Sequence, residues 1–286
     1  MSILKASKDY DLLDSGEGLK LERFGNFKII RPDPQVIWDK KDLSIWENAD
    51  FVFEQNEKNG KWKKIKEFPK DWSIEIDGLF FKLKHGVFKH LGIFPEQSIH
   101  FTWLRDKIDQ GLKENGIVSV LNLFGYTGIL SVFCAKYGAE VCHVDASEAS
   151  VDLAFKNRDL NNLSKEPIKF IVDDVRKFIE REIRRGKKYD IIIMDPPLYG
   201  RGVKNEVWNL EEDLSKLLKK IPKLLSKNPI AILLNGYASN YSHVTYKQVL
   251  ESNLNLKGNF SSGEIFIEES GSERLLPVGI FSRWDK

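Results

Sequence analysis

Four short groups of chemically active residues follow apolar runs between residues 118 and 200. The first contains two glycines, the second begins with an acid, the third begins with two acids, and the fourth is an acid followed by two prolines. They are Phe124-Gly125-Tyr126-Thr127-Gly128, Asp145-Ala146-Ser147, Asp173-Asp174-Val175 and Asp195-Pro196-Pro197. Short apolar runs predict buried strands, and the carboxyl ends of parallel strands meet along one edge of a sheet. We therefore expect the four groups to lie together.

The first three groups suit a ligand that has a carboxylate, a ribose and an adenine. Gly125 and Gly128 would let the backbone approach a ligand closely, and the helix that follows would offer free N–H groups to a methionine carboxylate. Asp145 would accept hydrogen bonds from both ribose hydroxyls. Asp174 would accept one from the adenine amino group, with Val175 against the ring. The pattern predicts an S-adenosylmethionine site.

The glycine spacing argues against the alternative of a nicotinamide dinucleotide. A G-x-G-x-x-G motif that begins at Gly125 would need glycines at positions 127 and 130, where the sequence has Thr127 and Leu130. The close backbone approach that a pyrophosphate needs is therefore missing. An oxidoreductase remains a distant alternative, which a test of NADH binding would check.

The fourth group continues as Asp195-Pro196-Pro197-Leu198-Tyr199, and we expect it to hold the methyl acceptor. Two consecutive prolines make a stiff turn without N–H groups, which leaves carbonyls and the Asp195 carboxylate as hydrogen-bond acceptors. These acceptors could orient an exocyclic amine or a ring nitrogen, and Tyr199 could stack on a flat base. We assign the catalytic role to Asp195, Pro196, Pro197 and Tyr199. The simpler interpretation is a Pro-Pro strand terminator.

The two cysteines of the chain do not fit a covalent mechanism. Methylation of carbon 5 of a pyrimidine needs a cysteine nucleophile. Neither Leu198, after the two prolines, nor the run Asn235-Gly236-Tyr237 after the last parallel strand supplies one. Cys134 lies in a predicted helix and Cys142 in a predicted strand, so both are expected in the core. The five histidines show no metal-ligand spacing, so we expect no metal.

The elements that would position these groups alternate between strand and helix from residue 117 onward. Strands are predicted at 118–124, 140–145, 168–172, 189–195 and 231–235, with amphipathic helices between them. This alternation is typical of an open, mostly parallel sheet with helices on both faces. Two further β-like runs, 263–268 and 277–284, predict an antiparallel addition to that sheet.

The first third of the chain is predicted to be β-rich. Its clearest signal is Asp77-Gly78 between the alternating runs 72–76 and 79–83, a pattern that predicts a β-hairpin. Runs at 21–30, 51–55 and 62–65 are also strand-like, and the last two flank a loop with Asn59-Gly60. We predict two domains: a β-rich accessory domain, 1–97, and an S-adenosylmethionine-dependent methyltransferase domain, 98–286.

The four groups, read as Asn122-Leu-Phe-Gly-Tyr-Thr-Gly128, Val144-Asp145-Ala-Ser147, Asp174-Val175 and Asp195-Pro-Pro, resemble those of class I methyltransferases. The subgroup that the chain most resembles includes the ribosomal RNA large-subunit methyltransferases that modify cytosine C5 or guanine N7. The run His90-Leu-Gly-Ile-Phe-Pro-Glu-Gln97 resembles a motif of that subgroup that lies over the cofactor. The resemblance implies a Rossmann-like fold and adds Phe94 and Gln97 to the expected cofactor-binding residues.

The sequence also departs from this subgroup. The chain has no room for the additional N-terminal RNA-binding domain that some relatives carry. The cysteine of the cytosine enzymes is missing where the fifth strand ends, and Leu198 separates the prolines from the aromatic residue, unlike the D-P-P-Y of amino-group methylases. The resemblance therefore implies the reaction type and leaves the methylated atom open.

Charge and composition limit the partners. The net charge is +2, so an RNA partner would have to be recognised by local patches. Candidate patches are 61–66, 176–188 and 216–227, although solvated surface is the simpler interpretation of each. The chain shows no apolar signal segment, no apolar run of membrane-spanning length and no disulfide framework. We expect a cytoplasmic protein with no membrane partner; its oligomeric state is not indicated.

Three hypotheses follow. The first is an enzyme that methylates a base in structured RNA, with ribosomal RNA as the expected partner. The second keeps the chemistry and changes the substrate to a protein side chain or a small molecule, a hypothesis motivated by the modest net charge. The third is a non-catalytic RNA-binding module with the same fold.

Overall fold

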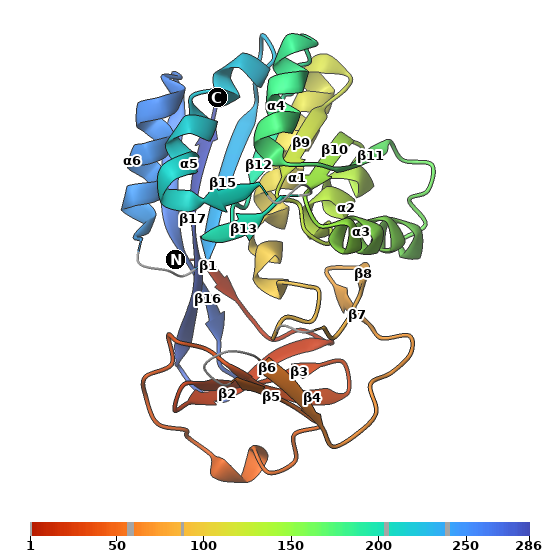
Figure 1. Cartoon of the computed structure of the whole chain (residues 1–286), viewed down its shortest axis with the longest axis vertical. Coiled ribbons are helices and arrows are strands. Elements are labelled where there is room, and N and C mark those ends of the chain that lie inside the picture. Colours follow the sequence, from red (N-terminus) through yellow and green to blue (C-terminus); the bar gives the residue numbers. More distant parts are fainter. Residues whose placement is uncertain (1, 56–59, 87–88, 203–205, 238–240) are drawn as a thin grey trace. The chain divides into compact units, whose positions relative to one another are not determined.

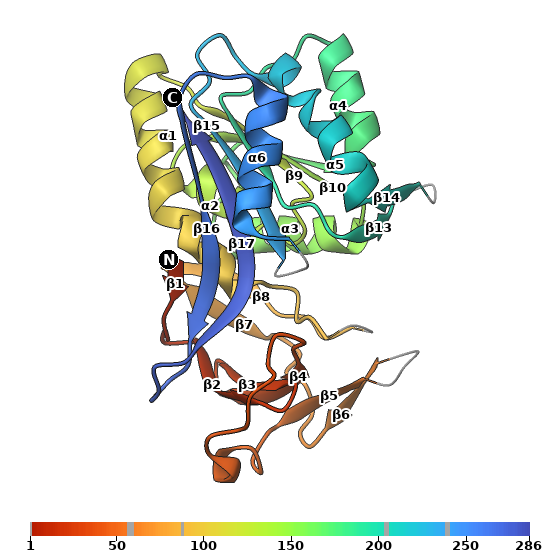
Figure 2. The same ribbon diagram turned by 90° about the vertical axis from the view of Figure 1, so that its left-hand side faces the viewer.

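The computed structural model describes residues 2–55, 60–86, 89–202, 206–237 and 241–286. Its contacts divide the chain into two compact units. The first unit comprises Met1–Ile99 and Ile265–Val278, and the second comprises His100–Glu264 and Gly279–Lys286. Strands β16 (Asn259–Glu268) and β17 (Leu275–Asp285), shown side by side in Figure 2, contribute residues to both units. The predicted boundary between residues 97 and 98 stays a prediction.

The second unit is built on a mostly parallel sheet (Figure 1). In spatial order its strands are β17, β15, β12, β9, β10 and β11. All neighbouring pairs from β15 to β11 are parallel, and β17 is antiparallel to β15. The bounds are β9 (Ser119–Leu123), β10 (Glu140–Asp145), β11 (Ile168–Val172), β12 (Ile191–Met194) and β15 (Ala231–Tyr237). The predicted Rossmann-like α/β class and its antiparallel last strand are confirmed.

The strand order reverses beside β9, which pairs with β10 on one side and with β12 on the other. Ligands of open α/β sheets bind at the carboxyl ends of the strands at such a reversal. Short β-branched and leucine-rich runs form these strands because both faces of the sheet are covered. The fourth strand is shorter than the predicted 189–195: Tyr189 makes an isolated bridge with Leu225, and Asp195 lies beyond the strand end.

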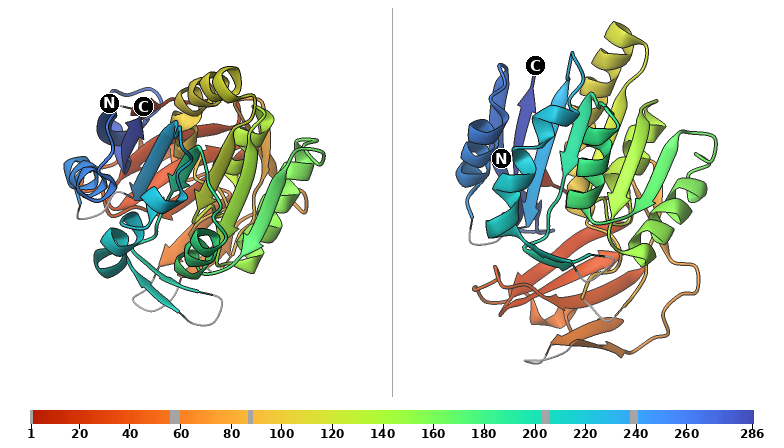
Figure 3. Two further views of the ribbon diagram at one scale, coloured as in Figure 1. Left: turned by 90° about the horizontal axis from the view of Figure 1, so that it is seen from above. Right: turned by 45° about the horizontal axis from the view of Figure 1, so that its top comes forward.

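Helices cover both faces of this sheet (Figure 3). Leu121, Leu123, Ile192 and Met194 pack on one face in a core with residues of α4, α5 and α6. Asn122 and His143, which alternate with that set, point to the other face, where Ser131 of α2 contacts both. The helices are α1 (Phe101–Asn115), α2 (Ile129–Lys136), α3 (Glu148–Leu160), α4 (Val175–Arg184), α5 (Leu210–Leu218) and α6 (His243–Leu254).

The first unit is β-rich, as predicted. Its main sheet has the order β2, β3, β4, β5 and β6, and β7 and β8 form a separate hairpin. Asp77 (φ 48°) and Gly78 (φ 75°) turn that hairpin in the left-handed region, which confirms the predicted Asp-Gly turn. Asn59 of the other predicted loop lies outside the described residues.

The bounds of the first unit's strands are β1 (Ser2–Leu4), β2 (Tyr10–Gly16), β3 (Leu19–Phe24), β4 (Phe27–Pro32), β5 (Phe51–Gln55), β6 (Gly60–Lys64), β7 (Ser73–Ile76) and β8 (Leu79–Lys82). A buried ion pair ties the main sheet together. Arg31 on β4 donates to both carboxylate oxygens of Glu22 on β3 at 2.8 Å, and the Tyr10 hydroxyl on β2 donates to Glu22 at 2.9 Å. Such a bidentate pair has strict geometry, so it fixes the alignment of three strands.

Candidate cofactor and acceptor site

The four predicted groups lie along the carboxyl edge of the parallel sheet. Main-chain hydrogen bonds join each strand end to its neighbour. They run from Gly125 N to the Val144 carbonyl (3.0 Å), from Asp173 N to the Asp145 carbonyl (3.1 Å) and from Asp195 N to the Leu123 carbonyl (3.3 Å). The structure therefore brings the glycine loop, Asp145, the Asp173-Asp174 pair and Asp195 onto one edge.

The loop after β9 has an unusual backbone. Phe124 (φ 57°), Tyr126 (φ 50°) and Gly128 (φ 86°) are all in the left-handed region. For the two aromatic residues this conformation costs about 1–3 kcal/mol each, so surrounding contacts must hold it. Backbone outliers of this kind gather at ligand clamps, and the alternation of φ turns successive N–H groups toward one side.

Buried polar side chains of β9, β10 and α2 support this loop. Asn122 donates to the Ser131 hydroxyl at 2.8 Å, and that hydroxyl lies 2.9 Å from Nδ1 of His143. Burial lowers the pKa of His143 to about 4, so the imidazole is neutral. A Cβ on Gly125 would come within 2.5 Å of the His143 ring, so only glycine fits over it. Asn157 fixes the loop from α3 by donating to the Thr127 carbonyl at 2.9 Å.

The helix that follows the loop begins without a side-chain cap. Gly128 is the N-cap residue of α2 and has no side chain to accept from the first turn. By contrast, α3 and α4 are capped by Ser147 and Asp174. A Cβ on Gly128 would also lie 2.8 Å from the Ala154 Cβ. The first turn of α2 thus suits an anion such as a methionine carboxylate.

Asp145 has the geometry of a ribose acceptor. Its two carboxylate oxygens accept from Tyr126 N and from Ser147 N, each at 2.8 Å. These bonds leave lone pairs free on a half-buried carboxylate, because an ionised carboxylate can accept about four hydrogen bonds. Burial raises the pKa of Asp145 above its usual value. Ala146 is half-buried beside it, and Ser147 caps α3, so the cofactor contacts predicted for these two residues stay predictions.

The two acids after β11, Asp173 and Asp174, already interact with other groups of the protein. Asp174 accepts from the main chain of Arg176 (3.0 Å) and Lys177 (3.2 Å) as the cap of α4, and from the Arg176 guanidinium at 3.0 and 3.3 Å. Asp173 pairs with Arg181 at 2.6 Å. An adenine amino group would have to share the Asp174 carboxylate with these donors, and Val175 is buried in the core. The adenine contacts of Asp173, Asp174 and Val175 stay predictions.

Asp195-Pro196-Pro197 leads from β12 into a short hairpin. Its strands are β13 (Tyr199–Arg201) and β14 (Val207–Asn209). We call residues 195–201 and 207–209 the acceptor arm, and residues 124–128, Asp145 and the first turns of α2, α3 and α4 the cofactor side. Tyr199 is 59% exposed, and its predicted stacking on a base stays a prediction.

Some residues at this edge were not predicted from the sequence. Trp208 of β14 is buried, and its indole N–H donates to the Pro197 carbonyl at 2.7 Å, so one of the predicted carbonyl acceptors is already in use. Burial, with a further contribution from the charge of Asp195, raises the pKa of Tyr246 on α6. A polar residue inside an apolar run was the available signal for Asn122 and His143, whereas Trp208 had none.

Phe94 and Gln97 belong to the first unit. The Phe94 ring is 4.9 Å from His90, and Gln97 N donates to the Phe94 carbonyl at 3.1 Å. Gln97 is buried and lies in the 3-10 helix Pro95–His100. The cofactor contacts that the family resemblance implies for these two residues stay predictions.

The cysteines lie in the core, as predicted. Cys134 on α2 and Cys142 on β10 are both buried free thiols. Burial raises the pKa of Cys134 to about 12 and that of Cys142 to about 11. A thiol with such a pKa supplies almost no thiolate near neutral pH, and the thiolate is the nucleophile.

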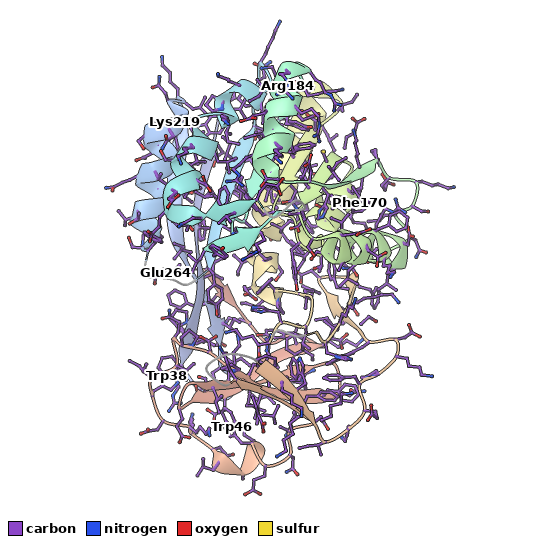
Figure 4. The ribbon with its side chains drawn as sticks, viewed as in Figure 1. Trp38, Trp46, Phe170, Arg184, Lys219 and Glu264 are labelled. Carbon is purple, nitrogen blue, oxygen red and sulfur yellow. The ribbon has the colours of Figure 1, made fainter. Side chains whose placement is uncertain are left out.

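About half of the basic residues in the three patches form ion pairs with acids. In the second patch, Arg176, Lys177, Arg181 and Arg185 form ion pairs. Lys220 of the third patch pairs with Glu180 of α4 at 2.5 Å. Figure 4 shows Arg184 and Lys219, which stand where α4 and α5 end. Because a helix rises about 1.5 Å per residue, Arg184 lies about 13.5 Å along α4 from Val175, the first residue of the helix.

None of the helices among the described residues is both long and apolar enough to span a membrane. In that same part of the chain, no group of three or more His, Cys, Asp or Glu side chains is arranged to hold a metal ion.

The donor set fits S-adenosylmethionine. The uncapped start of α2 suits the carboxylate of the ligand, and the Asp145 side chain has lone pairs left for the ribose hydroxyls. The glycine loop lets the backbone approach the ligand closely. The model of the S-adenosylmethionine-dependent methyltransferase family matches residues 55–242, more than half of the chain. A solved S-adenosylmethionine-dependent methyltransferase from Agrobacterium tumefaciens is 38% identical, with a TM-score of 0.92 over 99% of this chain and 93% of that chain.

A methyltransferase structure from Streptococcus mutans, at 21% identity and a TM-score of 0.71 over 97% of this chain and 76% of that chain, shares the fold. Among relatives, ribosomal RNA large subunit methyltransferase K of Neisseria meningitidis is 33% identical over 121 residues, 42% of this chain and 34% of its own length. Methyltransferase K/L of Pseudoalteromonas atlantica is 31% identical over 173 residues, 60% of this chain and 23% of its own length. The chain thus spans about a third or less of these relatives. Family model, fold and site geometry agree, and the chain belongs to the S-adenosylmethionine-dependent methyltransferases.

Proposed function

We propose that this protein methylates a base in structured RNA, with ribosomal RNA as the first substrate to test and the cytoplasm as the place of reaction. The proposal rests on one observation. A main-chain hydrogen bond joins Asp195, the first residue of the acceptor arm, to Leu123 at the edge of the cofactor loop. An exposed Tyr199 follows four residues later. The matched relatives named as ribosomal RNA large subunit methyltransferases support RNA as the substrate class.

On the cofactor side, the residues bind and orient. S-adenosylmethionine, when bound, supplies an activated methyl group. The first turn of α2 would hold its carboxylate, and Asp145 would accept from its ribose hydroxyls. The buried network of Asn122, Ser131 and His143 keeps the glycine loop in the shape that this binding needs. Orientation of this kind is the main contribution a protein makes to such a transfer.

On the acceptor arm, the Asp195 carboxylate would accept a hydrogen bond from the amine or ring N–H of the target base. This bond would point the nitrogen toward the methyl group and could take the proton that the nitrogen loses. Tyr199 would stack on the base after it leaves the RNA helix. The turn at Pro196 and Pro197 keeps Asp195 at the strand end because its φ angles are restricted.

A covalent cysteine route is not part of the proposal. The two cysteines of the chain are both buried, on α2 and β10, and their pKa values are raised by burial. A direct transfer to a nitrogen needs no enzyme nucleophile, so it suits this arrangement better than methylation of pyrimidine carbon 5.

Two measurements test the proposal. Calorimetric titration with S-adenosylmethionine should show binding that Asp145→Ala weakens about 10- to 100-fold, the effect of losing hydrogen bonds to a charged group. Asp152→Ala, which removes the same charge from an exposed ion pair with Lys156 on α3, should bind as the wild type does. Absence of binding to the wild-type protein would contradict the cofactor assignment.

The second measurement identifies the substrate. Cofactor with a labelled methyl group is supplied with ribosomal RNA from a strain that lacks the gene, and the modified nucleotide is mapped. Label in RNA supports the proposal. Label that appears only in protein or small molecules would replace RNA with that substrate class. RNA binding without transfer to any fraction would identify a non-catalytic module.

A further inference from the structure

Trp208 touches both halves of the candidate site. Its indole N–H donates to the Pro197 carbonyl at 2.7 Å, which ties it to the Asp195-Pro196-Pro197 turn. Its ring lies 4.8 Å from that of Phe124, with an interplanar angle of 58°. Phe124 is the first residue of the glycine loop and has a φ of 57°. One buried side chain therefore contacts both the glycine loop and the Asp195-Pro196-Pro197 turn.

The position of Trp208 is itself fixed. A strand of three residues has little stability of its own, so β14 depends on the contacts that hold it. The Val207 carbonyl accepts from the Arg176 guanidinium at 2.9 Å, and Asn209 caps α5 by accepting from Glu211 N at 3.0 Å. Arg176 also donates to Asp213 at 3.0 Å. Both neighbours of Trp208 are thus tied to helices.

The indole is 4% exposed and packs in the core beneath the sheet edge, together with residues of α4, α5 and β12. The Pro197 carbonyl has no N–H partner in a regular sheet ladder, because the arm has left β12 at this point. Pro197 itself is exposed, so the hydrogen bond from the buried Trp208 indole anchors this carbonyl to the core. Loss of the donor would allow that carbonyl to rotate, and the Asp195-Pro196-Pro197 turn would become more mobile.

We infer that Trp208 is a positioning residue, which holds the Asp195-Pro196-Pro197 turn at a fixed distance from the Phe124 loop and so sets the separation of methyl donor and acceptor. This inference rests on the proposed function, because it assigns the two sides their roles. Trp208 does not touch the reacting atoms. Its effect is on geometry, and a displacement of about 1 Å can lower a transfer rate about 100-fold.

Trp208→Phe tests this, because it keeps an aromatic ring against Phe124 and removes the N–H. Trp284→Phe is the matched control: Trp284 is equally buried in the same core, and its indole nitrogen has no hydrogen-bond partner among the described residues. We expect Trp208→Phe to lower kcat about 10-fold and to change the dissociation constant of S-adenosylmethionine less than threefold. Trp284→Phe should change neither by more than twofold.

Amide hydrogen exchange of the full chain with S-adenosylmethionine present gives a readout that needs no RNA. Trp208→Phe should speed exchange in the peptides that cover 119–128 and 195–202, and Trp284→Phe should not. Arg176→Gln, which weakens the hold on β14, should speed exchange in 195–202 as well. Equal exchange in wild type and Trp208→Phe, or equal effects of both tryptophan variants, would overturn the inference. If the wild type methylates no RNA, the proposed function fails, while the exchange comparison still decides the role of Trp208.

Discussion

The cofactor side and the acceptor arm belong to the same unit but are held in different ways. The cofactor side rests on buried polar side chains below the loop, on helix caps at Ser147 and Asp174, and on a strained loop backbone. The acceptor arm contains two three-residue strands and the turn that leads into them, and its Leu198 and Tyr199 side chains are exposed. The cofactor side is therefore part of the sheet edge, whereas the acceptor arm extends from the sheet and is held by few contacts.

This difference separates two tasks. The cofactor is the same molecule in every turnover, so a preorganised site binds it with the smallest ordering cost. Under the proposed function, an RNA base would have to enter and leave as part of a large partner, and an exposed aromatic residue on a short hairpin suits that task. Changes on the cofactor side should therefore alter the affinity for S-adenosylmethionine. Changes on the acceptor arm should alter kcat or the KM for RNA.

The largest effect on the cofactor side is expected for Gly125→Ala. The new Cβ would come within 2.5 Å of the buried His143 ring, and neither the ring nor the loop can move without breaking the network below. We expect S-adenosylmethionine to bind about 100-fold more weakly by calorimetry. Gly86→Ala is the control, because its Cβ would meet nothing within 4 Å. Unchanged affinity in Gly125→Ala would show that the loop does not contact the cofactor.

Asp195→Ala tests the other half of the comparison. We expect kcat to fall about 100-fold, because the acceptor nitrogen loses its orienting hydrogen bond, while the affinity for S-adenosylmethionine changes less than threefold. Asp190→Ala is the matched control at the opposite end of β12, where Asp190 accepts from Ser119 N at 2.9 Å; it should lower stability and leave kcat near the wild-type value. If Asp195→Ala weakened cofactor binding instead, the division between the two sides would be wrong.

A smaller effect is expected for Tyr199→Ala. Stacking of a base on an aromatic ring contributes about 1–3 kcal/mol, so the KM for RNA should rise about 10-fold in steady-state assays. Tyr199→Phe keeps the ring and should stay within about twofold of the wild type. Equal losses in both variants would assign the effect to the hydroxyl group and not to stacking.

The sequence located the strand ends of the cofactor side better than the packing of the acceptor arm, for a physical reason. Short apolar runs and the residues directly after them are local signals, and the parallel sheet then brings the four groups together. The Asp-Gly hairpin at residues 77–78 was equally local. Segments whose neighbours are close in sequence, or follow from one regular fold, can therefore be located without a structure.

The remaining features depend on contacts that no local pattern reveals. The bond from Trp208 to Pro197 joins residues in an arm whose strands show no alternation, because only three residues pair on each side. The adenine contact predicted for Asp174 stays a prediction, but the sequence did not show that this carboxylate also accepts from Arg176 and caps α4. Residues 265–278, assigned from the sequence to the second domain, make their contacts in the first unit. Each of these facts follows from packing and not from spacing.

The smallest expected effect comes from pH, and it acts on the support of the cofactor side. Burial lowers the pKa of His143 from an ordinary value near 6.5 to about 4, so the unfolded chain binds a proton that the folded chain does not between these values. The stabilising contribution of the neutral imidazole is complete above about pH 6.5 and is lost as pH falls toward 4. From pH 7 to 5.5 this loss is about 1 kcal/mol.

Urea unfolding of the wild type and of His143→Gln at several pH values isolates this contribution. Because glutamine does not titrate, the wild type should lose about 1 kcal/mol more than the variant between pH 7 and 5.5. A parallel slope in both proteins would contradict a neutral, buried His143. The second comparison is the affinity for S-adenosylmethionine over the same pH range. If stability depends on pH more steeply in the wild type, and the affinity also falls only in the wild type, His143 supports the loop that binds the cofactor. The hydrogen bond of His143 to Ser131 lies on the cofactor side, so the effect of the acceptor arm on kcat should not change over this pH range.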